Sequence, residues 1–211
     1  MANFTIADIK ALREQLGTGM VDTKKALEEA DGDLEKAVEI LRLKGAKGNA
    51  KRADRSTSEG LVVAREGQGE VTLVELACET DFVAKNAKFI ALADKVADAA
   101  AAVSADSVEA ALAAPAAEQT VEQLISEEAA VLGEKIVLRR VRTLTGDKFE
   151  VYLHKTSKDL PPQIGVVVAY TGDDATTARS IAQHISFANP TYLAREDVPA
   201  ADVEKEREIV T

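Results

Sequence analysis

The residues that could carry nucleophilic or metal chemistry are few in this sequence. It has one cysteine, Cys78, and two histidines, His154 and His184. Neither Cys-x-x-Cys nor His-x-x-x-His accompanies them, so no metal site is predicted. In EVTLVELAC, Cys78 shares the alternating face of Val74 and Leu76, which favours a small buried side chain over a thiolate nucleophile.

His154 differs from Cys78 because it ends the stretch KFEVYLH. Phe149, Val151 and Leu153 form one apolar face of this predicted strand, which leaves His154 on the opposite face at its end. We therefore expect His154 to reach solvent or a partner protein.

A site for recognition rather than catalysis is indicated by CETDFVAKN at residues 78–86. Here an acid and a phenylalanine stand between an apolar strand and an apolar helix. In one interpretation Thr80 or Asp81 caps the helix and Phe82 packs it against the sheet. In the other, Asp81 and Phe82 form a projecting wedge, with apolar area to enter a groove and charge to compete for a cation or a donor. The residue types alone allow both.

The elements that must position these residues begin with residues 1–45, whose apolar spacing predicts three short helices. Thr5 with Asp8 resembles a capping box. Asp33 can cap the third helix and Gly45 can end it. A unit this small buries little surface, so it suits a docking role better than catalysis.

Residues 46–58 change abruptly to small, polar and basic residues without apolar periodicity, which predicts a linker. Its basic side chains could touch phosphates, but a solvated hinge is the simpler interpretation of one isolated run. These side chains are Lys47, Lys51, Arg52 and Arg55.

Residues 59–190 switch to strands with a period of two, separated by long helices. GLVVAR and EVTLVELAC flank EGQGE, whereas KIVLRRVRTL and KFEVYLH flank TGD, so two hairpins are predicted. IGVVVAY is almost wholly apolar, which is typical of a central strand. Thr120 and Gln123 predict the capping box of a helix that ends near Gly133. The predicted fold class is α+β, a three-helix domain followed by a mainly antiparallel sheet covered by helices.

The composition limits the function classes. The chain has 211 residues, 46% of them hydrophobic, and a net charge of -10 at pH 7. Such an acidic chain is a poor general binder of nucleic acid, whose backbone is recognised by clustered Lys and Arg. No signal peptide, membrane span or P-loop motif occurs, which predicts a cytoplasmic protein that binds neither a membrane nor a nucleotide of its own. Residues 191–211 begin a charged helical arm without a final cap, so we expect a truncated chain.

Two stretches resemble the signatures of one family. TDFVAKN is similar to the T-D-F-V-A-[KR]-[DN] signature of translation elongation factor Ts. The stretch LREQLGTGMVDTKKALEEADGDLEKAVEILRLKG resembles that family's N-terminal signature. The similarity continues through IGVVVAY and REDVPAADVEKEREI and covers essentially the whole chain. It implies that the small domain is ubiquitin-associated-like.

The resemblance implies a guanine-nucleotide exchange factor that binds elongation factor Tu, both GDP-bound and nucleotide-free, and displaces Mg²⁺ to loosen the phosphate site. It implies no cofactor, no metal and no catalytic acid or base, and it is compatible with a homodimer. The exchange loop would be Thr80, Asp81, Phe82 and Val83. The partner contacts would be Met20, Val21 and His154. Many members have a second methionine at the place of Val21, and a shorter connection after His154.

Three alternatives remain at this stage. A helical docking scaffold would leave Asp81 and Phe82 dispensable for any rate effect. A cysteine-dependent enzyme would lose activity in Cys78→Ser. An RNA-binding auxiliary would bind through the basic run with a steep dependence on salt.

Overall fold

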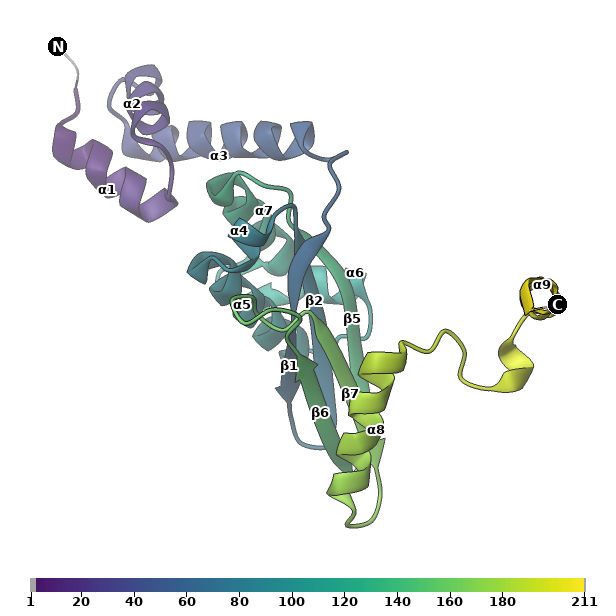
Figure 1. Cartoon of the computed structure of the whole chain (residues 1–211). Helices are drawn as coiled ribbons and strands as arrows, with labels where there is room; N and C mark the ends of the chain where they lie inside the picture. Colours follow the sequence, from purple (N-terminus) through teal and green to yellow (C-terminus); the bar gives the residue numbers. More distant parts are fainter. Residues whose placement is uncertain (1–2, 211) are drawn as a thin grey trace.

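The computed structural model describes residues 3–210, which form a small helical domain joined to a mixed α+β core (Figure 1). The core has an antiparallel sheet with helices packed on it, which confirms the predicted fold class. A short 3₁₀ turn (Arg195–Asp197) and helix α9 (Ala200–Val210) follow the core, and α9 stands apart from it in the figure. No helix within residues 3–210 is both long and apolar enough to cross a membrane.

Local chemistry fixes the ends of the helices in the small domain. The predicted capping box is present, because Thr5 Oγ1 accepts from Asp8 N while the Asp8 carboxylate accepts from Thr5 N. Asp33 caps the third helix by accepting from Lys36 N. The three helices are α1 (Ile6–Leu16), α2 (Met20–Glu29) and α3 (Leu34–Lys51). They enclose a core of Ile9, Leu12, Ala26, Leu27, Ala30, Ala37 and Leu41.

Helix α3 extends farther than predicted, so the expectation that Gly45 ends it and that the linker begins at residue 46 is wrong. The reason is packing against α7 (Val121–Leu132). A Cβ on Gly45 would lie 2.9 Å from Ala130 Cβ, so the absence of a side chain allows the two helices to approach closely. Beyond it, Asn49 Nδ2 donates to Ser126 O at 2.7 Å. These contacts outweigh the low helix propensity of glycine.

The core is built on a three-stranded antiparallel sheet in the order β1–β2–β5, and the predicted β1–β2 hairpin is confirmed. Helix α5 covers one face and buries Phe89, Leu92 and Val96. The capping box of Thr120 with Gln123 is present. The strands are β1 (Glu59–Glu66), β2 (Glu70–Cys78), β3 (Pro115–Ala116), β4 (Gln119–Thr120) and β5 (Val137–Thr145). The helices between them, besides α7, are α4 (Asp81–Ala84), α5 (Ala87–Ala102) and α6 (Val108–Ala113).

The second predicted hairpin and the predicted central strand are both wrong. Strand β5 pairs with β2, whereas β6 (Lys148–His154) pairs with β7 (Ile164–Tyr170) in a separate two-stranded sheet. Strand β7 is apolar because it is covered on both faces, by the larger sheet and by α8 (Ala175–Ala188), rather than because it has two strand neighbours. A Cβ on Gly165 would lie 2.6 Å from Val62 Cγ1, which shows how closely the two sheets pack.

Candidate functional site

The stretch 78–86 forms a strand-to-helix corner whose tip projects from the core. Thr80 Oγ1 caps α4 by accepting from Val83 N at 3.4 Å. Val83 and Ala84 are buried in the core cluster and anchor this short helix. Phe82 is 73% exposed, so it does not pack the helix against the sheet. Of the two interpretations, the structure has Thr80 as the cap and Phe82 as a projecting side chain.

The tip also carries a pair of opposite charges. Lys85 Nζ lies 3.1 Å from Asp81 Oδ2 and 4.6 Å from the centroid of the Phe82 ring. The pair is solvent-exposed and contributes little to stability, so a partner can replace either contact at small cost. The corner therefore offers an apolar ring beside a carboxylate on a rigid base.

The corner is also fixed by hydrogen bonds to a residue that the sequence did not indicate. Glu134, in the connection between α7 and β5, accepts hydrogen bonds from Thr80 Oγ1, Thr80 N and Glu79 N at 2.6, 3.0 and 3.0 Å. No local pattern could have indicated it, because its partners lie 54 and 55 positions earlier in the chain.

Met20 and Val21, predicted to contact a partner, occupy the first turn of α2 and are 44% and 64% exposed. The α1–α2 turn before them lines a cleft of about 1460 Å³, together with Lys88 of α5 and Val131 of α7. A Cβ on Gly17 would lie 2.7 Å from Val131 Cγ1. The turn that precedes the two apolar residues thus packs against α7, the helix that precedes Glu134.

His154 lies at the end of β6 on the face opposite Leu153, as predicted. It shares this face with Tyr152, and its Nδ1 lies 3.0 Å from the tyrosine hydroxyl. This face is half-buried because α8 covers it, and the Arg179 guanidinium lies 5.6 Å from the centroid of the Tyr152 ring. Leu153, on the other face, is 37% exposed at the strand end. No described contact links His154 to the corner at residues 78–86.

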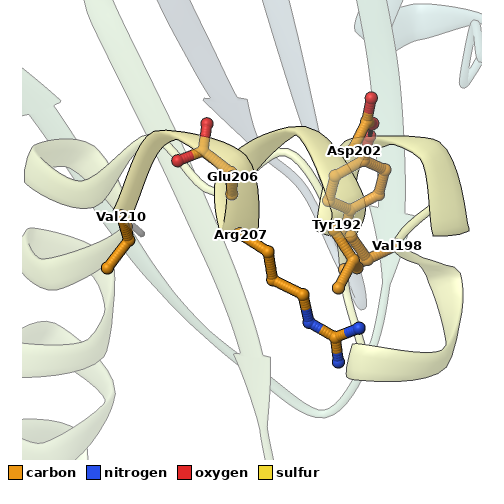
Figure 2. Close-up of a pocket in the computed structure, with 7 residues that line it drawn as sticks. Tyr192, Val198, Asp202, Glu206, Arg207 and Val210 are labelled. Atoms are coloured by element: carbon orange, nitrogen blue, oxygen red, sulfur yellow. Dashed lines mark hydrogen bonds between the residues drawn. The ribbon is translucent and has the colours of Figure 1, made fainter.

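A hollow of about 600 Å³ near the C-terminal end is lined by α9 and the segment before it (Figure 2). Tyr192 OH donates to Asp202 Oδ2 at 2.7 Å there, and this bond raises the pKa of the tyrosine. Every described residue of α9 is exposed. The hollow is therefore an open surface between neighbouring segments, not an enclosed binding pocket.

Cys78 is fully buried, on the same face as Val74 and Leu76, as predicted. Its Sγ donates to Thr80 O at 3.3 Å. Burial, with smaller contributions from the charges of Glu134 and Glu59, raises the pKa of the thiol to about 12. At neutral pH Cys78 is protonated, which disfavours a role as a nucleophile. Within residues 3–210 no group of three His, Cys, Asp or Glu side chains could hold a metal ion.

The raised pKa of Cys78 predicts a loss of stability at alkaline pH. Because the folded-state pKa of about 12 lies above the ordinary 9.0, the unfolded chain loses this proton first as pH rises. The free energy of unfolding should therefore decrease between pH 9.0 and about 12. Urea titrations of the parent and of Cys78→Ala across this range measure the effect. The variant should show a shallower decrease, and parallel pH profiles would refute the assignment.

The comparisons with known proteins show the family to which the chain belongs. The family model for Elongation factor TS matches residues 79–211, which include residues 79–86 of the corner and Glu134. The chain belongs to the elongation factor Ts family. Elongation factor Ts of Leifsonia xyli subsp. xyli is 73% identical over 100% of this chain and 76% of its own length. Elongation factor Ts of Clavibacter sepedonicus is 71% identical over 100% of this chain and 77% of its own, and that of Tropheryma whipplei is 53% identical over the same shares.

Membership of the elongation factor Ts family gives the chain its broad role, that of a translation elongation factor. Similarity to these relatives spans the small domain as well as the core. The chain spans about three quarters of the length of these relatives.

Proposed function

We propose that this chain is a guanine-nucleotide exchange factor for elongation factor Tu and that the corner at residues 80–83 is its exchange loop. The proposal rests mainly on the exposure of Phe82. This side chain is 73% exposed on a short helix whose next two residues are buried. A large apolar side chain fixed on a rigid base and left in solvent is suited to enter a groove of another protein. Asp81 beside it supplies the charge.

The mechanism requires no catalytic acid or base in this chain. GDP is held through its phosphates and a Mg²⁺ ion that needs nearly ideal octahedral coordination, so a small displacement of the supporting elements weakens both. A wedge that binds better to the Mg²⁺-free and nucleotide-free form of the partner accelerates GDP release through this difference in affinity. By reciprocity, nucleotide must weaken the binding of the factor, which allows GTP to displace it.

Two further surfaces fit the same partner. Met20 and Val21 offer exposed apolar side chains on the first turn of a helix, and valine in place of methionine keeps the apolar character with less flexibility. His154 offers an imidazole at a strand end. We assign these residues to partner binding rather than to the displacement of Mg²⁺, because among these three surfaces the exchange loop alone combines an acid with an exposed aromatic ring.

The RNA-binding alternative is less well supported by the contacts of the basic residues. Arg52 Nη2 donates to Asn49 Oδ1 at 2.7 Å, and Arg55 Nη1 lies 3.2 Å from Glu79 Oε2. These two cations are engaged within the protein, and the chain as a whole is acidic. A role in translation elongation also accords with the predicted cytoplasmic location.

The test is the release of a fluorescent GDP from elongation factor Tu, followed after mixing with the chain and an excess of unlabelled GDP. We expect the observed rate constant to rise with the concentration of the chain and to saturate. A scaffold would bind elongation factor Tu and leave the rate unchanged. Measuring the affinity of the chain for RNA at several salt concentrations tests the RNA-binding alternative, because that affinity would fall steeply with salt.

A further inference from the structure

The end of β2 loses its strand partners before the exchange loop begins. The ladder with β5 ends at the pair Ala77 and Val137, and the ladder with β1 ends at the pair of Cys78 with Glu59. The next two backbone N–H groups, of Glu79 and Thr80, therefore have no strand to bond. Without another acceptor, the direction in which the chain leaves the sheet would not be fixed.

Glu134 provides that acceptor. One carboxylate oxygen, Oε2, accepts from both Glu79 N and Thr80 N at 3.0 Å, and the other, Oε1, accepts from Thr80 Oγ1 at 2.6 Å. Hydrogen bonds to a carboxylate are shorter and stronger than those between neutral groups. Three such bonds on one half-buried side chain fix both the backbone and the side chain of the residue that precedes Asp81.

The bond to Thr80 also determines how the exchange loop is capped. A threonine hydroxyl has one proton to donate, and its oxygen lone pairs accept. Because the proton is directed to Glu134, a lone pair is available to Val83 N, which donates to Thr80 Oγ1 at 3.4 Å. The helix that carries Asp81 and Phe82 is thus oriented by the residue that holds its cap.

A reciprocal contact strengthens the arrangement. Lys135 N donates to Glu79 Oε1 at 2.6 Å, and this bond, together with the neighbouring Arg55, lowers the pKa of Glu79. Lys135 Nζ donates in turn to Ala53 O at 2.5 Å, in the segment that leaves α3. The residues 79–80 and 134–135 are therefore joined by bonds in both directions, and the same contacts reach the connection to the small domain.

We propose that Glu134 is a positioning residue for nucleotide exchange, which fixes the direction in which Asp81 and Phe82 project from the core. The inference rests on the proposed function. Glu134 is not part of the wedge, so a substitution at Glu134 leaves both Asp81 and Phe82 in place. The loop then samples other directions, and the fraction that is competent to open the nucleotide site falls.

Glu134→Ala and Glu134→Gln test this in the full chain, with Glu122→Ala as the control. Glu122 is an exposed acid on α7, so its variant loses the same charge. The saturating rate of GDP release from elongation factor Tu should fall roughly threefold to tenfold in Glu134→Ala. Glutamine keeps one carbonyl oxygen for the two N–H groups, so it should recover part of the rate. Glu122→Ala should match the parent.

A second measurement on the chain alone separates positioning from a general loss of stability. Amide hydrogen exchange of Glu79 and Thr80 should become faster in Glu134→Ala than in the parent, while exchange in α5 and β1 stays unchanged. Faster exchange throughout the core would mean that Glu134 acts on overall stability, and would overturn the inference.

The kinetic outcomes distinguish this inference from the proposed function. A parent chain that accelerates GDP release and a Glu134→Ala variant that does so equally well would overturn the positioning role alone. A parent chain that binds elongation factor Tu and leaves GDP release unchanged would overturn the exchange function, and the positioning role with it.

Discussion

Phe82→Ala is expected to reduce the saturating rate of GDP release from elongation factor Tu by roughly 10- to 100-fold, within the range of couplings between linked sites. The ring is the largest exposed apolar group of the exchange loop, and its removal takes away the area that favours the opened form of the partner. Stopped-flow release of fluorescent GDP at a saturating concentration of each chain measures the effect. Binding to nucleotide-free elongation factor Tu, measured by calorimetry, shows how much of it is lost affinity.

The matched control for this variant is Phe187→Ala. Phe187 is 92% exposed on α8, so both variants remove a solvent-exposed phenylalanine. Neither should change the free energy of unfolding by more than about 0.5 kcal/mol, because surface substitutions away from structural features rarely do. Equal rates for Phe82→Ala and the parent would contradict the wedge, whatever the effect of Phe187→Ala.

Asp81→Ala separates the charge from the ring. In the free chain this substitution removes only the exposed ion pair between Asp81 and Lys85, so the fold should be unaffected. If the carboxylate competes for a cation or a donor near Mg²⁺, the double variant with Phe82→Ala should be slower than either single variant. Neighbouring residues of one functional unit are coupled, so a non-additive result is expected.

Several helix ends, though not that of α3, were predictable because they depend on residues close in sequence. The capping boxes of Thr5 and Thr120 and the left-handed cap at Gly133 each involve a side chain or backbone group within a few positions. The burial of Cys78 followed from its place on the same face of β2 as Val74 and Leu76. Local chemistry and periodicity determine these features wherever tertiary contacts do not oppose them.

The strand pairing was not predictable in the same way. A short turn between two apolar runs indicates a hairpin, yet the turn between β5 and β6 connects two different sheets. Similarly, the apolar run of β7 reports burial on both faces, and that burial comes from a sheet and a helix instead of two strands. Periodicity shows which face is buried and leaves open what covers it.

The candidate site was predictable in its residue types and not in its geometry. The sequence identified Thr80 to Val83 as a junction but could not decide whether Phe82 pointed inward. That depends on Val83 and Ala84, which fill the space beneath the helix. Glu134 could not be identified at all, because its partner Thr80 lies 54 positions earlier in the sequence.

The packing of α3 on α7 changes how the two partner-binding surfaces are related. A flexible linker would give Met20 and Val21 a wide range of positions, whereas the structure fixes them relative to the exchange loop. Besides the close approach of Gly45 to Ala130, Arg42 Nη2 lies 3.3 Å from Glu127 Oε1. Two surfaces held at a fixed separation that matches the partner bind more tightly than the same surfaces on a loose tether, since the second contact is then intramolecular.

Gly45→Leu should therefore reduce the affinity for nucleotide-free elongation factor Tu by roughly 10- to 100-fold, within the gain that linked binding surfaces provide. A Cβ at this position already lies 2.9 Å from Ala130 Cβ, so a leucine must push α3 away from α7. The overpacking costs about 1–3 kcal/mol, and moving the small domain relieves it without unfolding either domain. Calorimetric titration measures the affinity, and circular dichroism verifies that both domains remain folded.

Gly48→Leu, one helical turn later, is the matched control. A Cβ on Gly48 meets only the guanidinium of Arg52, at 3.4 Å, which is an ordinary contact. This variant gains helix propensity without displacing α7, so its affinity should equal that of the parent or exceed it slightly. If both leucine variants bind as tightly as the parent, the small domain binds elongation factor Tu independently of its position on α7. A loss of affinity confined to Gly45→Leu would mean that the packing of α3 on α7 determines the distance between the small domain and the exchange loop.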